Sequence, residues 1–176
     1  QMDNRIRFAA RAHGSALLLS DDGARMSLLK KAPGAGKHAK PIHAAIALKV
    51  DGAKVVTPIA KTEHQLAVST NYFIGKNPSK WRSNVPTFTK VTYPQIKDGV
   101  DLVYHGENGY LEYDFIVSPG TNVDTVAINV EGANIEVTKK GDLTIHTRAG
   151  DILQPKPITY QVDPTTGTRK IIASSY

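Results

Sequence analysis

Short apolar segments separated by glycine-containing turns recur along this chain of 176 residues, and no long segment has helical periodicity. The clearest segment is 110–117, where Leu111 and Tyr113 alternate with Glu112 and Asp114. Successive side chains of a β-strand point to opposite faces of the sheet. The alternation therefore predicts a strand with one buried face and one polar face.

The same signature predicts strands along most of the chain. The other expected ranges are 6–10, 15–20, 24–29, 42–50, 54–59, 87–93, 100–105, 126–130, 134–138, 143–147, 151–154, 158–162 and 170–174. Short strands at this spacing predict an all-β fold, either an antiparallel sandwich or an irregular barrel. Because no change in composition marks a boundary, we expect a single β-rich domain over residues 1–176.

Two parts of the chain are less regular. Residues 42–50 are rich in alanine, but the segment is short and ends at an Asp-Gly pair, which favours a strand with 54–59 as its hairpin partner. Residues 62–85 lack clear alternation. The Asn-Pro pair at 77–78 indicates a turn or a single helical turn.

Charge is distributed unevenly. The net charge is +6, yet residues 1–90 hold 15 basic and 5 acidic residues, whereas residues 91–176 hold 7 and 11. The densest basic segment, about residues 30–41, is expected to be a variable solvated loop. It contains no aromatic residue and no arginine, which disfavours nucleic-acid binding. Opposite charges on the two halves favour contacts between copies of the chain.

Several classes of protein are excluded by what the sequence lacks. The absence of cysteine excludes disulfides, zinc–thiolate sites, iron–sulfur clusters and a thiol nucleophile. No apolar run approaches the roughly 20 residues of a membrane-spanning helix. Common nucleophile, nucleotide and metalloprotease motifs are also absent. No signal peptide begins at Gln1, so we expect any export signal to have been removed.

Glu112 and Asp114 are the candidate pair of reactive carboxylates. Two residues apart on one strand, they point the same way at a backbone separation of about 7 Å. Such a pair suits acid–base chemistry on a glycoside or helps to hold a divalent cation. The simpler interpretation is that they form the solvated polar face of the strand.

No metal site or cofactor is predicted. None of the histidines lies at a zinc-ligand spacing from another; they are His13, His38, His43, His64, His105 and His146. The acidic loops 21–23 and 122–124 resemble fragments of calcium sites but lack the complete pattern, so calcium stays open.

Aromatic residues offer a different kind of recognition. Trp81, the single tryptophan, has Tyr72 and Tyr104 in the same half of the chain. Sugar-binding modules present such rings to pyranose faces, so these residues are candidate glycan contacts. Alternatively, Trp81 anchors a small core under an irregular loop.

Several motifs occur together, in order, over most of the chain. They are Ile6-Arg7-Phe8, Ser15-Ala16-Leu17-Leu18-Leu19, Asn71-Tyr72-Phe73-Ile74-Gly75, Lys80-Trp81-Arg82-Ser83-Asn84-Val85-Pro86-Thr87, Gly99-Val100-Asp101-Leu102-Val103-Tyr104, Leu111-Glu112-Tyr113-Asp114-Phe115, Val130-Glu131-Gly132-Ala133, Gly141-Asp142-Leu143 and Lys156-Pro157-Ile158-Thr159-Tyr160-Gln161. Together they resemble the uncharacterised N-terminal domain of bacterial secreted or cell-surface proteins that carry seven-bladed β-propeller-type (SBBP) repeats. Residues 30–65 match least well.

The resemblance implies an extracellular or cell-surface, β-rich, non-catalytic module with no catalytic residues to transfer. We expect it to act through neighbouring domains or copies of itself, as a structural or adhesive unit. The strand-like segments 2–10 and 171–176 could donate or accept a strand and so build filaments. The alternatives are a carbohydrate-binding module using Trp81, and a glycoside hydrolase or lyase using Glu112 and Asp114.

Overall fold

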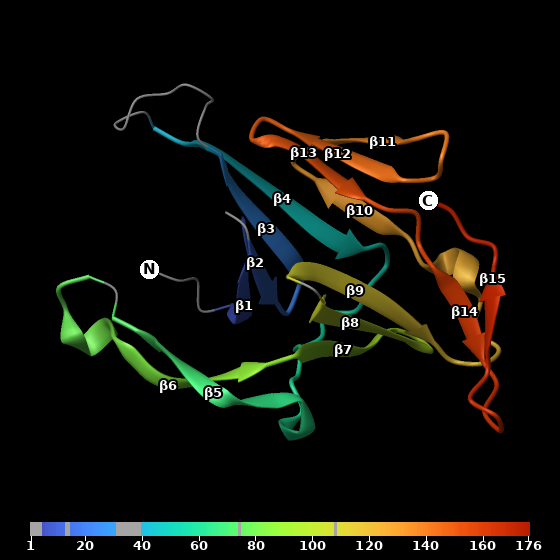
Figure 1. Ribbon diagram of the computed structural model, residues 1–176, viewed down its shortest axis with the longest axis horizontal. Helices are drawn as coiled ribbons and strands as arrows, with labels where there is room; N and C mark the ends of the chain where they lie inside the picture. The colour runs from blue at the N-terminus through green and yellow to red at the C-terminus, as the bar shows by residue number, and fades with distance from the viewer. Residues whose placement is uncertain (1–4, 13–14, 31–39, 74, 108) are drawn as a thin grey trace.

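The computed structural model describes residues 5–12, 15–30, 40–73, 75–107 and 109–176 (Figure 1). Within them the strands are β1 (Ile6–Ala12), β2 (Ser15–Ser20), β3 (Gly23–Lys30), β4 (Ile42–Val50), β5 (Gln65–Tyr72), β6 (Arg82–Phe88), β7 (Lys90–Lys97), β8 (Val100–Glu107), β9 (Tyr110–Val117), β10 (Ile128–Glu131), β11 (Asn134–Val137), β12 (Leu143–Thr147), β13 (Gly150–Gln154), β14 (Thr159–Val162) and β15 (Arg169–Ile172). The described residues also form three single-turn 3₁₀ helices: η1 (Thr62–His64), η2 (Pro78–Lys80) and η3 (Val123–Thr125).

Two antiparallel sheets form the body of the molecule. One has five strands in the order β1-β2-β3-β4-β10, and the other has three in the order β7-β8-β9. Figure 1 shows β7–β9 beside the strands of the larger sheet, with β11-β12-β13 next to β10. Among the described residues the sheets do not close into a barrel, so the fold is an all-β sandwich.

The core lies between the inner faces of these sheets. Alternation supplies it: every second residue of β4, such as Ile46 and Leu48, packs toward Val100 and Leu102 of β8. Ile145 of β12 extends the same cluster. Removing this apolar area from water is the main source of stability in a chain without disulfides.

Two ribbons extend from this body. Among the residues that the structure describes, β5 and β6 pair only with each other, and so do β14 and β15. Strand β6 continues into β7 after Thr89, whose amide donates to the carbonyl oxygen of His64 at 2.8 Å. The β5–β6 ribbon and the C-terminal hairpin β14–β15 lie at opposite ends of the view in Figure 1.

The structure confirms residues 42–50 as a strand and 78–80 as a single helical turn, which Asn77 caps through its side chain. The prediction that 54–59 pairs with 42–50 was wrong. Strand β4 already has β3 on one side and β10 on the other. Residues 54–59 instead run toward the smaller sheet, where Ile59 forms an isolated bridge with Thr92.

Two boundaries also differ from the prediction. Residues 65–72 and 82–88 form strands although their sequences alternate only weakly. The two segments pair with each other, and the hydrogen bonds between them stabilise both strands. The expected single strand 87–93 is divided at Thr89 into β6 and β7. In the part of the chain that the structure describes, none of the helices has the length and apolarity that a bilayer crossing requires.

Candidate functional site

The outer face of β8 and β9 brings four chemically active side chains together. His105 and Glu107 lie two residues apart on β8, and Glu112 is the direct partner of His105 on β9. One potential ligand atom from each of these three residues lies within 4.8 Å of the others. The imidazole Nε2 of His105 is also 3.0 Å from Oδ2 of Asp114. We call these four residues the β8–β9 cluster.

Exposure differs sharply within this cluster. The side chain of His105 is only 14% exposed, whereas that of Asp114 is 64% exposed. Glu107 and Glu112 are both exposed. The histidine is therefore held against the sheet, and the carboxylates around it retain freedom to reorient. Lys90 is the partner of His105 on β7, on the side away from Glu112.

Glu112 and Asp114, the predicted pair of reactive carboxylates, thus belong to the polar face of β9. Asp114 is engaged by His105, an interaction that spacing along the chain did not indicate. Neither carboxylate lines the two hollows described below. The convergence of His105, Glu107 and Glu112 is compatible with cation binding.

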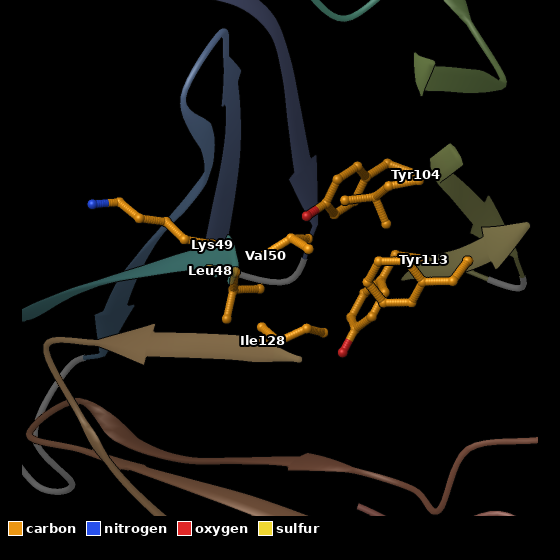
Figure 2. A pocket seen from close by; sticks show the side chains of 8 residues that line it. Leu48, Lys49, Val50, Tyr104, Tyr113 and Ile128 are labelled. Atoms are coloured by element: carbon orange, nitrogen blue, oxygen red, sulfur yellow. The ribbon is translucent and has the colours of Figure 1, made fainter. Parts of the chain in front are cut away.

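The opposite face of the same strands is apolar. Tyr104, a candidate glycan contact, is 8% exposed. Its ring meets that of Tyr93 edge-to-face at a centroid distance of 6.0 Å and that of Tyr113 at a tilt at 5.9 Å. Figure 2 shows Tyr104 and Tyr113 facing a cavity of about 10 Å³ beside Leu48 and Ile128. This space is too small for any ligand beyond a water molecule. Tyr104 is therefore a core residue.

Burial also explains the acid–base behaviour of these rings. Loss of water around Tyr104 and Tyr113 raises the pKa of both phenols. The pKa of Tyr113 is raised less than burial alone would make it, because Gln154 donates to its hydroxyl at 3.2 Å. Neutral hydroxyls at the seam between the sheets serve packing, and no proton-transfer role follows from them.

Trp81 lies at the tip of the β5–β6 ribbon. Its indole Nε1 donates to the carbonyl oxygen of Gly75 at 3.1 Å, and its ring meets Phe73 edge-on at 5.3 Å. Trp81 is 39% exposed and Phe73 is 61% exposed. Tyr72, the other candidate, is half-buried on β5. Trp81 therefore holds the tip loop in place while leaving part of its ring accessible.

The carboxylates of the first acidic loop, residues 21–23, pair with arginine side chains. Arg7 forms a two-pronged ion pair with Asp21, at 2.8 and 3.0 Å. Arg25 contacts Asp22 at 2.8 Å, and the hydroxyl of Ser20 donates to the same carboxylate at 2.6 Å. These bonds from Arg7 and Arg25 lower the pKa of Asp21 and Asp22 respectively. The loop is a locked turn.

The second acidic loop caps a helical turn. The side-chain oxygen of Asn122 accepts from the backbone amide of Asp124 at 3.0 Å, as an N-cap residue does. This hydrogen bond accounts for the asparagine without a metal. The basic segment 30–41 lies largely outside the described residues, since 31–39 are not among them.

A second His–carboxylate group lies on β11–β13. His146 has Nδ1 at 3.1 Å from Asp151 and Nε2 at 3.5 Å from Glu136. The hydrogen bond to Asp151 raises the pKa of the imidazole. His146 also lines an open hollow of about 500 Å³ formed with β4 and the β10–β11 turn. Because each nitrogen faces a carboxylate, this group forms ion pairs when His146 is protonated.

The C-terminal hairpin presents an exposed apolar surface. Ile158 is 80% exposed, Ile171 is 69% exposed and Val162 is 55% exposed. Tyr160 and Ile171 are direct cross-strand partners, so they share a face with Val162. Residue spacing predicted these strands, but nothing in the local pattern indicated that the hairpin would stay uncovered.

The comparisons with known proteins place the chain in a family. A family model described as "Domain of unknown function (DUF7948)" matches residues 1–176. The chain belongs to this family. No curated protein and no solved structure matches it. Membership in DUF7948 supports the expectation of an uncharacterised domain.

Proposed function

We propose that this DUF7948 domain is a non-catalytic structural or adhesive module of a bacterial secreted or cell-surface protein. It acts by binding copies of itself and neighbouring domains, including SBBP-type repeats, and does so outside the cell. The observation that carries this proposal is the uncovered apolar face of the C-terminal hairpin. Tyr160, Val162 and Ile171 form that face together with Arg169, the cross-strand partner of Val162.

A two-stranded hairpin is marginally stable alone in water. All four residues of β14 are exposed, and three of the four residues of β15 are exposed. Arg169 lies over the ring of Tyr160 at 4.5 Å, and Ser174 donates to the carbonyl oxygen of Pro157 at 2.8 Å. These contacts order the hairpin but leave Val162 and Ile171 exposed to water, so a partner would gain free energy by covering them.

Open strand edges support the same proposal. Within the described residues β1 ends one side of the five-stranded sheet, and β14 and β15 pair only with each other. Unpaired backbone groups at such edges accept a further strand. The two exposed ribbons lie at opposite ends of the view in Figure 1, an arrangement that suits head-to-tail contacts between copies.

Self-association of the purified chain tests the proposal. We expect the mass measured by light scattering to rise with concentration at low salt. Substitution Ile171→Lys should prevent the rise by placing a charge on the apolar face. Val55→Lys is the matched control, because Val55 is 78% exposed but lies outside the hairpin. Association unaffected by Ile171→Lys would contradict the role of the hairpin.

A carbohydrate-binding role is the second candidate, and the tip of the β5–β6 ribbon favours it. Phe73 and Trp81 offer adjacent exposed rings there, as sugar-binding surfaces do. Glycan-array binding that is lost in Phe73→Ala would support this role. Phe73 is the informative position, since Trp81 also holds the loop through Gly75. An array without signal would remove the candidate.

A further inference from the structure

We propose that the β8–β9 cluster is a site for a divalent transition-metal cation of the Zn²⁺ type. His105, Glu107 and Glu112 are its ligands, and Asp114 is a positioning residue. The site is separate from the hairpin surface proposed above, so either proposal can fail without the other.

Strand pairing creates the donor set. His105 and Glu107 project from the same face of β8, and the register sets Glu112 directly opposite His105. One nitrogen and two carboxylate oxygens thereby converge within 4.8 Å of one another. This combination of imidazole and carboxylate ligands suits Zn²⁺, whereas Ca²⁺ and Mg²⁺ favour sets made of oxygen alone.

The distances are compatible with closure around an ion. Bonds of about 2.0–2.1 Å in a tetrahedral site place ligand atoms roughly 3.4 Å apart. The ligand atoms of the three residues lie within 4.8 Å, and the two glutamates are exposed. Rotation of these glutamate side chains therefore closes the set without moving the sheet. A water molecule would complete four ligands.

Asp114 orients the histidine. An ionised carboxylate only accepts hydrogen bonds. The Nε2–H group of His105 therefore donates a hydrogen bond to Oδ2 of Asp114 across the 3.0 Å contact. In neutral imidazole this leaves Nδ1 with the free lone pair. Carboxylates hold metal-binding histidines in this way and raise their basicity.

The low exposure of His105 indicates that its side chain is preorganised as a ligand. A side chain that is 14% exposed has already lost most of its freedom before an ion arrives. His146 offers a contrast, because both of its nitrogens face carboxylates and its side chain is 41% exposed. The two histidines therefore form a matched pair for experiment.

Calorimetric titration of the purified chain with Zn²⁺ tests the site. We expect one bound ion, with affinity reduced at least tenfold in His105→Ala and in Glu112→Gln, and unchanged in His146→Ala. Loss of a positioning carboxylate costs about 10–100-fold, so Asp114→Asn should also weaken binding. Thermal unfolding without metal will show that each variant is folded, and Glu112→Gln is a conservative change at an exposed position.

Imidazole resonances provide a second readout, independent of any substitution. Addition of Zn²⁺ should shift the side-chain signals of His105 and leave those of His146 in place. Absence of Zn²⁺ binding, binding retained in His105→Ala, loss in His146→Ala, or preference for Ca²⁺ over Zn²⁺ would each overturn the proposal.

Discussion

At the scale of single residues, Tyr93 connects the two sheets by a polar contact within the core. Its hydroxyl donates to the carbonyl oxygen of Ser20 at 2.9 Å, and Gly23 offers a second acceptor at 3.3 Å. Tyr93 and Ser20 are each only 1% exposed. Removal of the hydroxyl would therefore leave a buried carbonyl without its donor.

The substitution Tyr93→Phe should lower the free energy of unfolding by about 1–3 kcal/mol, the typical cost of an unsatisfied buried polar group. Urea unfolding measures this value. Tyr160→Phe is the control. Because Tyr160 lies in the exposed hairpin, this substitution should lower the free energy of unfolding much less. Equal losses in the two variants would show that the Tyr93 hydroxyl makes no special contribution.

The turn that Tyr93 contacts also makes the stability of the chain depend on pH. Hydrogen bonds from Arg25 and Ser20 lower the pKa of Asp22 in the folded chain. A lowered native pKa means that the stabilisation is present above the unfolded value of about 4 and is lost as the pH falls below it. Asp22→Asn should therefore destabilise the chain more at pH 7 than at pH 3. A penalty independent of pH would contradict this account.

Individual residues show how far sequence reasoning reaches. Alternation along 110–117 correctly assigned Tyr113 to the inner face and Glu112 to the outer one. It could not reveal that His105 faces Glu112, because this proximity depends on the register between two strands. Likewise, Asn84 was part of a family motif, yet its left-handed backbone (φ 55°) and its bond to Asn71 required coordinates.

At the scale of elements, the β10–β11 turn is pressed against β4. Gly132 has a φ of +86°, and a Cβ atom there would lie 2.7 Å from the carbonyl oxygen of Ala45. Gly120 has nearly the same φ, +82°, but nothing lies within 4 Å of its Cβ position. Substitution of either glycine introduces backbone strain, but only substitution of Gly132 also introduces a steric clash.

Gly132→Ala should therefore destabilise the chain more than Gly120→Ala. Left-handed strain costs about 1–3 kcal/mol at such a position and applies to both variants. The clash with the carbonyl oxygen of Ala45 adds a further cost only in Gly132→Ala. Thermal unfolding midpoints of the two variants give the comparison, and similar shifts would show that the turn can move away from β4.

The pairing of strands follows less directly from the sequence than the strands themselves do. Local alternation located most elements, but 54–59 was assigned to β4 because a short Asp-Gly connection favours a hairpin. The structure shows that β10, about eighty positions further along the chain, occupies that edge. Long-range pairing depends on packing of the whole core, which a local pattern does not encode.

At the scale of the whole molecule, two ribbons with little cover extend from a compact sandwich. The C-terminal hairpin exposes Tyr160, Val162 and Ile171, and the β5–β6 ribbon exposes Phe73 and Trp81. The charge of residues 1–90 is basic and that of residues 91–176 is acidic. Both features suit a module that is completed by contacts with other chains or domains.

Sedimentation velocity at low salt, from micromolar to near-millimolar concentration, tests this account most directly. The wild-type chain and Val55→Lys should both show a sedimentation coefficient that rises with concentration, whereas Ile171→Lys should remain a monomer throughout. A wild-type chain that stays monomeric across the range, or an Ile171→Lys variant that associates as the wild type does, would contradict the proposal that the C-terminal hairpin is an interaction surface.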